Sequence, residues 1–205
     1  MATKKMLAKA YAISLMGLAG TVIEVESEIS STLPGFVLVG LPDASLSESK
    51  DRVRAAIQNS GLKMPDRRVT VNLSPASVKK QGSSFDLAIA VSVMAAAGSL
   101  NGESVGQWVH LGELGLDGSV RRVTGILPAL LVAKAAGIKN AVVPQANFAE
   151  ANLVAGINLV AVEHFQQVAK MHGSLSEIEP AIYATTLIPN QETTEVGADL
   201  SNFLS

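Results

Sequence analysis

The sequence predicts an α/β domain built around a mixed β-sheet. Two stretches of alternating or β-branched residues, 11–18 and 21–29, open the chain, and helices alternate with strands after residue 61. Hydrophobic residues make up 48% of the 205 residues and charged residues only 17%, so most of the chain can bury a core. Aromatic residues contribute 4%, and the core must therefore consist mainly of Ala, Val, Leu and Ile.

The first third of the chain is rich in strands. Gly20 separates the two opening stretches, which predicts that they pair as antiparallel strands. The dipeptide Pro34-Gly35 predicts a turn, and residues 36–39 are expected to form a third, short strand after it.

A helix is predicted next, and it extends to about residue 60. Asp43 and Ser45 are both good residues for the N-cap, and Gly61 is a typical stop. Three apolar residues at positions i, i+7 and i+11 lie on one side of this helix and are expected to be buried: Leu46, Val53 and Ile57.

Strands and helices alternate from residue 68 onward. The predicted strands are residues 68–73, 108–114, 119–123, 139–143 and 158–162. The predicted helices are residues 84–97, 126–136, 147–155 and 163–172. Asp117-Gly118 is the strongest hairpin signal in the chain. The apolar run 87–100 is too short to span a membrane and contains Ser92, so it predicts a buried helix.

Composition also indicates the organisation and location of the chain. Residues 1–173 are expected to form one compact domain, and residues 174–205, with five acidic residues and no Lys or Arg, to form a linker. The absence of cysteine excludes disulfide bonds, thiolate zinc sites and cysteine nucleophiles. Together with the lack of a secretion or membrane signal, it predicts a cytoplasmic protein without membrane contact.

Charge is unevenly distributed. The net charge of −2 argues against a generally basic nucleic-acid-binding protein, but residues 50–80 carry eight basic and two acidic residues. This segment is either a solvated face or a contact surface for a phosphate backbone. Its candidate DNA contacts are Lys50, Arg52, Arg54, Lys79 and Lys80.

Motifs for cofactors are not found. A phosphate-binding loop requires a Gly-Lys pair, which the chain lacks, and the dinucleotide fingerprint is also absent. We therefore expect no cofactor and no ATP binding in this chain. The three histidines, His110, His164 and His172, are scattered and lack the spacing of a metal site, so we expect them to be exposed or half-buried.

Two sets of polar residues are candidates for chemistry. Ser83 and Ser84 precede a predicted helix, where backbone N–H groups can hold an oxyanion, but Ser83 with Asp86 also resembles a capping box. Capping is the favoured interpretation. Glu113 and Asp117 flank the hairpin and would need a shared pocket for acid–base work; solvated acids are the simpler alternative.

Five motifs in order identify a resemblance to a known family. They resemble the N-terminal domain of the ComM/YifB proteins, which are Mg-chelatase-related competence proteins of the AAA+ class. The similarity extends from about residue 11 to residue 173. The motifs are Gly40-Leu41-Pro42-Asp43 and the segments 50–56 (KDRVRAA), 69–76 (VTVNLSPA), 85–90 (FDLAIA) and 112–114 (GEL).

The resemblance implies a Lon-protease-like domain of the ribosomal protein S-five domain-2-like superfamily, with a left-handed β-α-β crossover. It also implies that an AAA+ ATPase domain, which holds ATP and Mg²⁺, follows the linker in the same polypeptide. The parent protein would be a homo-hexameric motor for DNA branch migration in natural transformation and recombination. On this basis the present chain is expected to be its non-catalytic accessory module, which assists ring assembly and contacts DNA.

The resemblance also places a peptidase dyad on the chain. Lon-type peptidases use a serine activated by a lysine. Ser84 lies at or near the serine position, whereas Pro128 stands at the lysine position and cannot act as a base. Lys134 lies about 9 Å further along the same helix. Ser84 is therefore a vestigial candidate; a serine hydrolase that uses Ser84 and a small-molecule-binding domain remain the alternatives.

Overall fold

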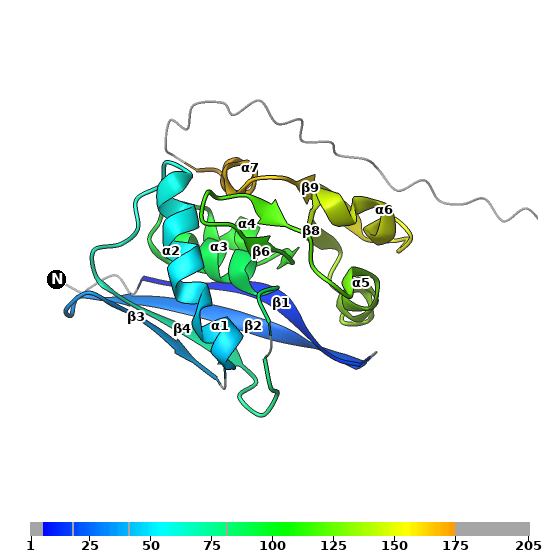
Figure 1. Ribbon diagram of the computed structural model, residues 1–205, viewed down its shortest axis with the longest axis horizontal. Coiled ribbons are helices and arrows are strands. Elements are labelled where there is room, and N and C mark those ends of the chain that lie inside the picture. Colours follow the sequence, from blue (N-terminus) through cyan, green and yellow to red (C-terminus); the bar gives the residue numbers. More distant parts are fainter. Residues whose placement is uncertain (1–5, 18, 41, 81, 175–205) are drawn as a thin grey trace, which may run out of the picture.

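The computed structural model describes residues 6–174 except residues 18, 41 and 81 (Figure 1). A seven-stranded sheet has the order β3-β4-β2-β1-β5-β8-β9, and β6 and β7 form a separate two-stranded ribbon. Four neighbouring pairs of the large sheet are parallel, namely β3–β4, β1–β5, β5–β8 and β8–β9. The mixed α/β fold is thus confirmed. The predicted linker, residues 174–205, lies outside the described residues apart from Ser174.

The strands match most of the predicted positions. They are β1 (Met6–Met16), β2 (Ala19–Ser30), β3 (Gly35–Val39), β4 (Arg68–Ser74), β5 (Val109–His110), β6 (Glu113–Leu114), β7 (Val120–Arg121), β8 (Asn140–Pro144) and β9 (Asn158–Val162). The helices are α1 (Ala44–Ser47), α2 (Ser49–Asn59), α3 (Asp86–Ala96), α4 (Gly102–Val105), α5 (Ile126–Ala135), α6 (Phe148–Ala151) and α7 (Phe165–Met171). A short 3-10 helix, Gln145–Asn147, precedes α6.

The opening hairpin organises the core. β1 pairs with β2 over its whole length, and its side chains alternate between two hydrophobic clusters. Ala10 and Ala12 face the cluster built around α3, whereas Ile13 faces the cluster built around α5. The predicted antiparallel pairing of the two stretches is confirmed, although Gly20 lies within β2 opposite Leu15 and not between the two strands. A Cβ atom at Gly20 would lie 2.7 Å from Val132, so glycine allows α5 to approach the hairpin closely.

The segment after β3 forms a β-α-β unit whose two strands, β3 and β4, are parallel neighbours. Asp43 caps α1 by accepting a hydrogen bond from the backbone N–H of Leu46 at 2.7 Å, as predicted. The predicted single helix is interrupted at Glu48, which separates α1 from α2. Leu46, Val53 and Ile57 are all buried, which confirms the predicted stripe.

The central helix α3 packs against β1 and β2 and also contacts α2 (Figure 1). All of its residues except Ala95 are buried, as expected of the apolar run. The predicted continuous strand 108–114 is wrong. The structure has two short strands there, β5 and β6, and β5 ends at His110. Gly112 instead exchanges backbone hydrogen bonds with Ser84 and Leu87 at the start of α3. The hairpin at Asp117-Gly118 is confirmed by the β6–β7 ribbon.

The predicted helix 147–155 is shorter in the structure and consists of the 3-10 turn and α6. Across residues 6–174, with the three gaps given above, no helix has the length and apolar character needed to cross a membrane.

Candidate functional site

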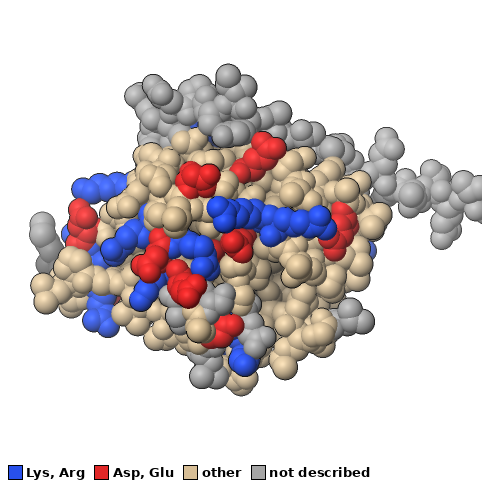
Figure 2. Space-filling model, in the orientation of Figure 1, with Lys and Arg blue, Asp and Glu red and all other residues tan. Residues whose placement is uncertain are grey.

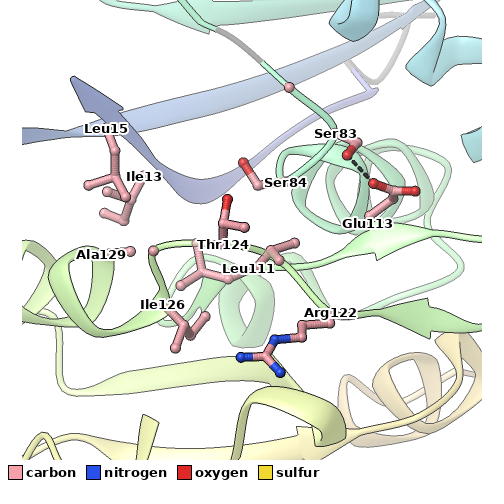
Figure 3. A pocket seen from close by; sticks show the side chains of 13 residues that line it. Ile13, Leu15, Ser83, Ser84, Leu111, Glu113, Arg122, Thr124, Ile126 and Ala129 are labelled. Atoms are coloured by element: carbon pink, nitrogen blue, oxygen red, sulfur yellow. Dashed lines mark hydrogen bonds between the residues drawn. The ribbon is translucent and has the colours of Figure 1, made fainter. Parts of the chain in front are cut away.

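A pocket of about 400 Å³ lies where β1, the loop before α3 and the start of α5 meet (Figure 3). Its wall is apolar and comes from β1, from the residue after β5 and from α5. These residues are Ile13, Leu15, Leu111, Ile126 and Ala129. Its rim is polar and consists of Ser83, Ser84, Glu113, Arg122 and Thr124. This arrangement of an apolar wall with a few polar groups is typical of a binding site.

Ser84 projects into this pocket, as Figure 3 shows. Its carbonyl oxygen accepts a hydrogen bond from Gly112 N–H, and the described part of the chain offers its hydroxyl no hydrogen-bond partner. Thr124 also projects into the pocket. The residue that the resemblance assigns to the serine position therefore lines a cavity.

The lysine that would activate Ser84 is not assembled with it. Gly125 and Ile126 line the pocket at the start of α5, and Pro128 follows in the first turn of that helix. Lys134 is turned elsewhere, because its Nζ donates a hydrogen bond to the carbonyl of Ala155 at 2.7 Å. Among the described residues that line the pocket, none is a lysine or a histidine.

Ser83 does not cap α3, contrary to the favoured interpretation. The N-cap of α3 is Phe85, and no side chain caps the helix. The hydroxyl of Ser83 instead donates a hydrogen bond to Oε2 of Glu113 at the pocket rim. The predicted cap is wrong because the helix begins at Asp86, two residues later than the predicted start at Ser84.

Comparison with known proteins decides the affiliation of this domain. The family described as subunit ChlI of Mg-chelatase matches residues 25–147, which is more than half of the chain. The chain belongs to the ChlI family. The matched residues 25–147 include β4, α3 and the two acidic residues Glu113 and Asp117.

Relatives of this ChlI-family chain include the proteins named by the sequence resemblance. Competence protein ComM of Haemophilus influenzae is 39% identical over 152 residues, which is 74% of this chain and 30% of ComM. YifB of Escherichia coli is 37% identical over 153 residues, 75% of this chain and 30% of YifB. A Mycobacterium tuberculosis protein is 47% identical over 162 residues, 79% of this chain and 32% of that protein. The chain thus spans about a third of these relatives.

A more distant relative supports the fold. Lon protease 2 of Bacillus subtilis is 27% identical over 121 residues, which is 58% of the ChlI-family chain and 21% of the protease. The described architecture agrees with a Lon-like domain. The expected resemblance to ComM and YifB is confirmed.

The two hairpin carboxylates do not share the pocket. Glu113 is half-buried at the rim, 3.9 Å from Arg121, whereas Asp117 is exposed at the hairpin turn. The hydroxyl and backbone N–H of Ser119 donate hydrogen bonds to Asp117 at 2.6 and 3.0 Å. These bonds lower the pKa of the Asp117 carboxyl. In this ChlI-family chain Asp117 is therefore a solvated acid at the hairpin turn, which agrees with the simpler alternative for this residue.

A buried ion pair joins α2 to α3 behind the pocket. The Asp86 carboxylate is fully buried and accepts hydrogen bonds from Arg52 Nε at 2.7 Å, from Leu114 N–H at 3.3 Å and from the Ser49 hydroxyl. Burial raises the pKa of Asp86, and the bonds from Arg52 and Ser49 oppose that shift. This cluster fixes the β6–β7 ribbon, and hence Glu113, against the two helices.

The predicted DNA contacts fall into two groups. Lys50, Arg54 and Lys79 are exposed. Arg52 is a correction, because its side chain is only 19% exposed and is engaged with Asp86. Lys80 is a second correction: it is fully buried, and its Nζ donates to the carbonyls of Gly40, at 2.9 Å, and Pro75. Burial lowers the Lys80 pKa.

Two of the histidines contradict the expectation of exposed or half-buried rings. His110 on β5 and His172 at the end of α7 are buried and lie against each other, although 62 residues separate them. His164 is half-buried, as expected, and its Nδ1 accepts a hydrogen bond from Gln166 N–H at the start of α7. Within the described part of the chain, no group of three or more metal-binding side chains is found.

Proposed function

We propose that this chain is the non-catalytic accessory module at the N-terminus of a ComM-type AAA+ ATPase. The parent protein is a cytoplasmic homo-hexamer that drives DNA branch migration during natural transformation and recombination. ATP and Mg²⁺ bind in the AAA+ domain of the same polypeptide, which is the first partner of this module. The module assists assembly of the ring and contacts DNA.

One observation carries the non-catalytic assignment. The pocket holds Ser84, but the first turn of α5 carries Pro128 where a Lon-type peptidase has its lysine. A serine hydroxyl is a weak nucleophile unless an adjacent base removes its proton. Lys134 is hydrogen-bonded to Ala155, and the described residues that line the pocket include no lysine to act as that base.

Three exposed cations support the DNA contact. Lys50 and Arg54 lie four residues apart on α2 and therefore on one side of that helix, and Lys79 lies in the loop before α3. Figure 2 shows acidic and basic side chains intermixed on the face that carries α1 and α2. Each module therefore offers few phosphate contacts, and a ring of several modules gains affinity by multivalency.

Charge reversal in the full-length protein tests the DNA contact. We expect Lys50→Glu with Arg54→Glu to weaken duplex binding and to reduce the slope of log affinity against log salt by about 0.9 for each lost phosphate contact. Lys139→Glu with Lys170→Glu has the same change in net charge on other exposed positions and is the matched control. DNA binding equal to that of the parent in the α2 variant would remove the module from the DNA interface.

Deletion of residues 1–173 from the full-length protein tests the role in assembly. Sedimentation velocity with ATP should show smaller assemblies for the truncated protein than for the parent. A truncated protein that forms the same rings at the same concentration would show that the motor domains assemble without help.

A further inference from the structure

Beside the pocket, part of β1 has a neighbouring strand on only one of its two edges among the described residues. β1 pairs with β2 along its full length, but it pairs with β5 only at Tyr11 and Val109. β5 ends at His110, and the chain then turns toward α3. Residues 12–16 of β1 therefore have one edge without a partner strand among the described residues.

This open edge lies at the pocket. Ile13 and Leu15, which belong to the unpaired part of β1, form one side of the cavity, and Ile126 and Ala129 of α5 lie among its other lining residues. The edge is held in place, because β2 covers its other side and the Ser14 hydroxyl donates to the carbonyl of Lys79 at 3.0 Å. A preformed edge binds a ligand at a lower entropic cost than a mobile one.

We propose that this pocket binds an extended peptide segment of a partner protein, which adds as a strand to the free edge of β1 and is not cleaved. A strand edge presents backbone donors and acceptors at regular intervals, and another extended backbone matches them. The apolar wall receives alternate side chains of the peptide, and the hydroxyls of Ser84 and Thr124 are available for its polar groups. This inference goes beyond the accessory role in ring assembly and DNA contact.

The composition of the pocket favours a peptide over single-stranded nucleic acid. No aromatic ring for stacking a base is present among the described lining residues, and the charges of Glu113 and Arg122 at the rim balance, so these residues give the pocket no net positive charge for a phosphate backbone. The volume of about 400 Å³ suits a few residues with small apolar side chains.

A selection experiment tests the proposal with the 205-residue chain. A display library of random peptides about a dozen residues long is selected on the chain and counter-selected on the variant Thr124→Trp. Thr124 is an exposed lining residue, so the indole fills the pocket without disturbing the core. Leu153→Trp places the same side chain at a position that is 75% exposed and outside the pocket, and it is the control.

We expect enriched peptides with apolar side chains at alternate positions. Fluorescence anisotropy should show binding that Thr124→Trp weakens about tenfold or more and that Leu153→Trp leaves unchanged. Hydrogen exchange at residues 12–16 should slow when the peptide binds. N-methylation of alternate backbone amides in the peptide should abolish binding, because it removes the donors needed for strand pairing.

Three results would overturn the proposal. One is a selection that enriches no peptide sensitive to Thr124→Trp. Another is equal affinity for the N-methylated peptide, which would make the pocket a site for side chains or small molecules alone. The third is a concentration-dependent dimer that Thr124→Trp abolishes while no peptide binds, which would assign the open edge to a second copy of this chain. Circular dichroism of both Trp variants checks that they fold.

Discussion

His110 and His172 face each other inside the domain, with their Nε2 atoms 3.0 Å apart. One ring must donate and the other accept, so the contact requires at least one neutral imidazole. The hydroxyl of Ser104 lies 2.8 Å from Nδ1 of His172, and the ring of Trp108 lies edge-on to it. The pair thereby fastens the end of α7 to β5 and α4, at the last turn of the described domain.

This pair predicts a loss of stability in mild acid. Burial lowers the pKa of His110 well below its usual range and lowers that of His172 to about 4. The unfolded chain takes up protons near pH 6.5, whereas the folded chain resists them, so stability is full above that pH and is lost as the pH falls toward 4. The unfolding free energy should drop by up to about 1.4 kcal/mol per pH unit for each histidine.

Urea unfolding between pH 7 and pH 4.5 measures this slope. His172→Gln removes one titrating group and should flatten the dependence on pH. Ser104→Ala keeps both imidazoles and should retain the parent slope, even though it removes a hydrogen bond. An identical slope in His172→Gln and the parent would show that other groups govern the acid response.

The buried cluster at Asp86 predicts a large effect of a single substitution. Asp86→Ala removes the buried carboxylate to which both the guanidinium of Arg52 and the hydroxyl of Ser49 donate. Loss of one member of a buried ion pair costs about 3–5 kcal/mol of stability. Denaturant unfolding should show this loss, whereas Asp66→Ala, which breaks the exposed pair with Lys63, should be nearly neutral. Equal small effects would contradict a structural role for the cluster.

Ser84 is expected to be chemically inert. The pocket rim holds no lysine or histidine among the described residues, so the hydroxyl lacks an activating base. A fluorophosphonate probe should leave the serine unmodified, and Ser84→Ala should not change any background peptidase activity. Covalent labelling of Ser84, detected by mass spectrometry, would restore the hydrolase alternative.

The chain on its own is expected not to bind ATP. It contains no Gly-Lys pair and hence no loop of the kind that surrounds the phosphates of a bound nucleotide. Isothermal titration calorimetry of the 205-residue chain with ATP and Mg²⁺ should give no saturable heat. Tight saturable binding would show that this chain has an ATP site of its own, separate from the AAA+ domain.

Some features of this protein could be predicted because they depend on local chemistry. Asp43 caps its helix through the third residue that follows, and Asp117-Gly118 forms its hairpin within a few residues. The stripe of Leu46, Val53 and Ile57 follows from helical periodicity. The family resemblance rests on five motifs in order and singled out Ser84, which the structure places in the pocket.

The errors lie where distant segments meet. Ser83 resembled a cap, but its hydroxyl binds Glu113, 30 residues away, which the fold brings to the same rim. The strand expected at residues 108–114 breaks because Gly112 pairs with Ser84 at the start of α3. No local pattern contains these contacts.

The sequence by itself determined the order of the elements, the apolar composition of the core and the membership of the family. Only the tertiary structure decided which polar groups became buried. Lys80 and Arg52 belong to one basic run, yet Lys80 is buried against the carbonyls of Gly40 and Pro75 and Arg52 is bound to Asp86. A buried charge is tolerated only beside compensating partners. Those partners come from remote parts of the chain, so only folding reveals them.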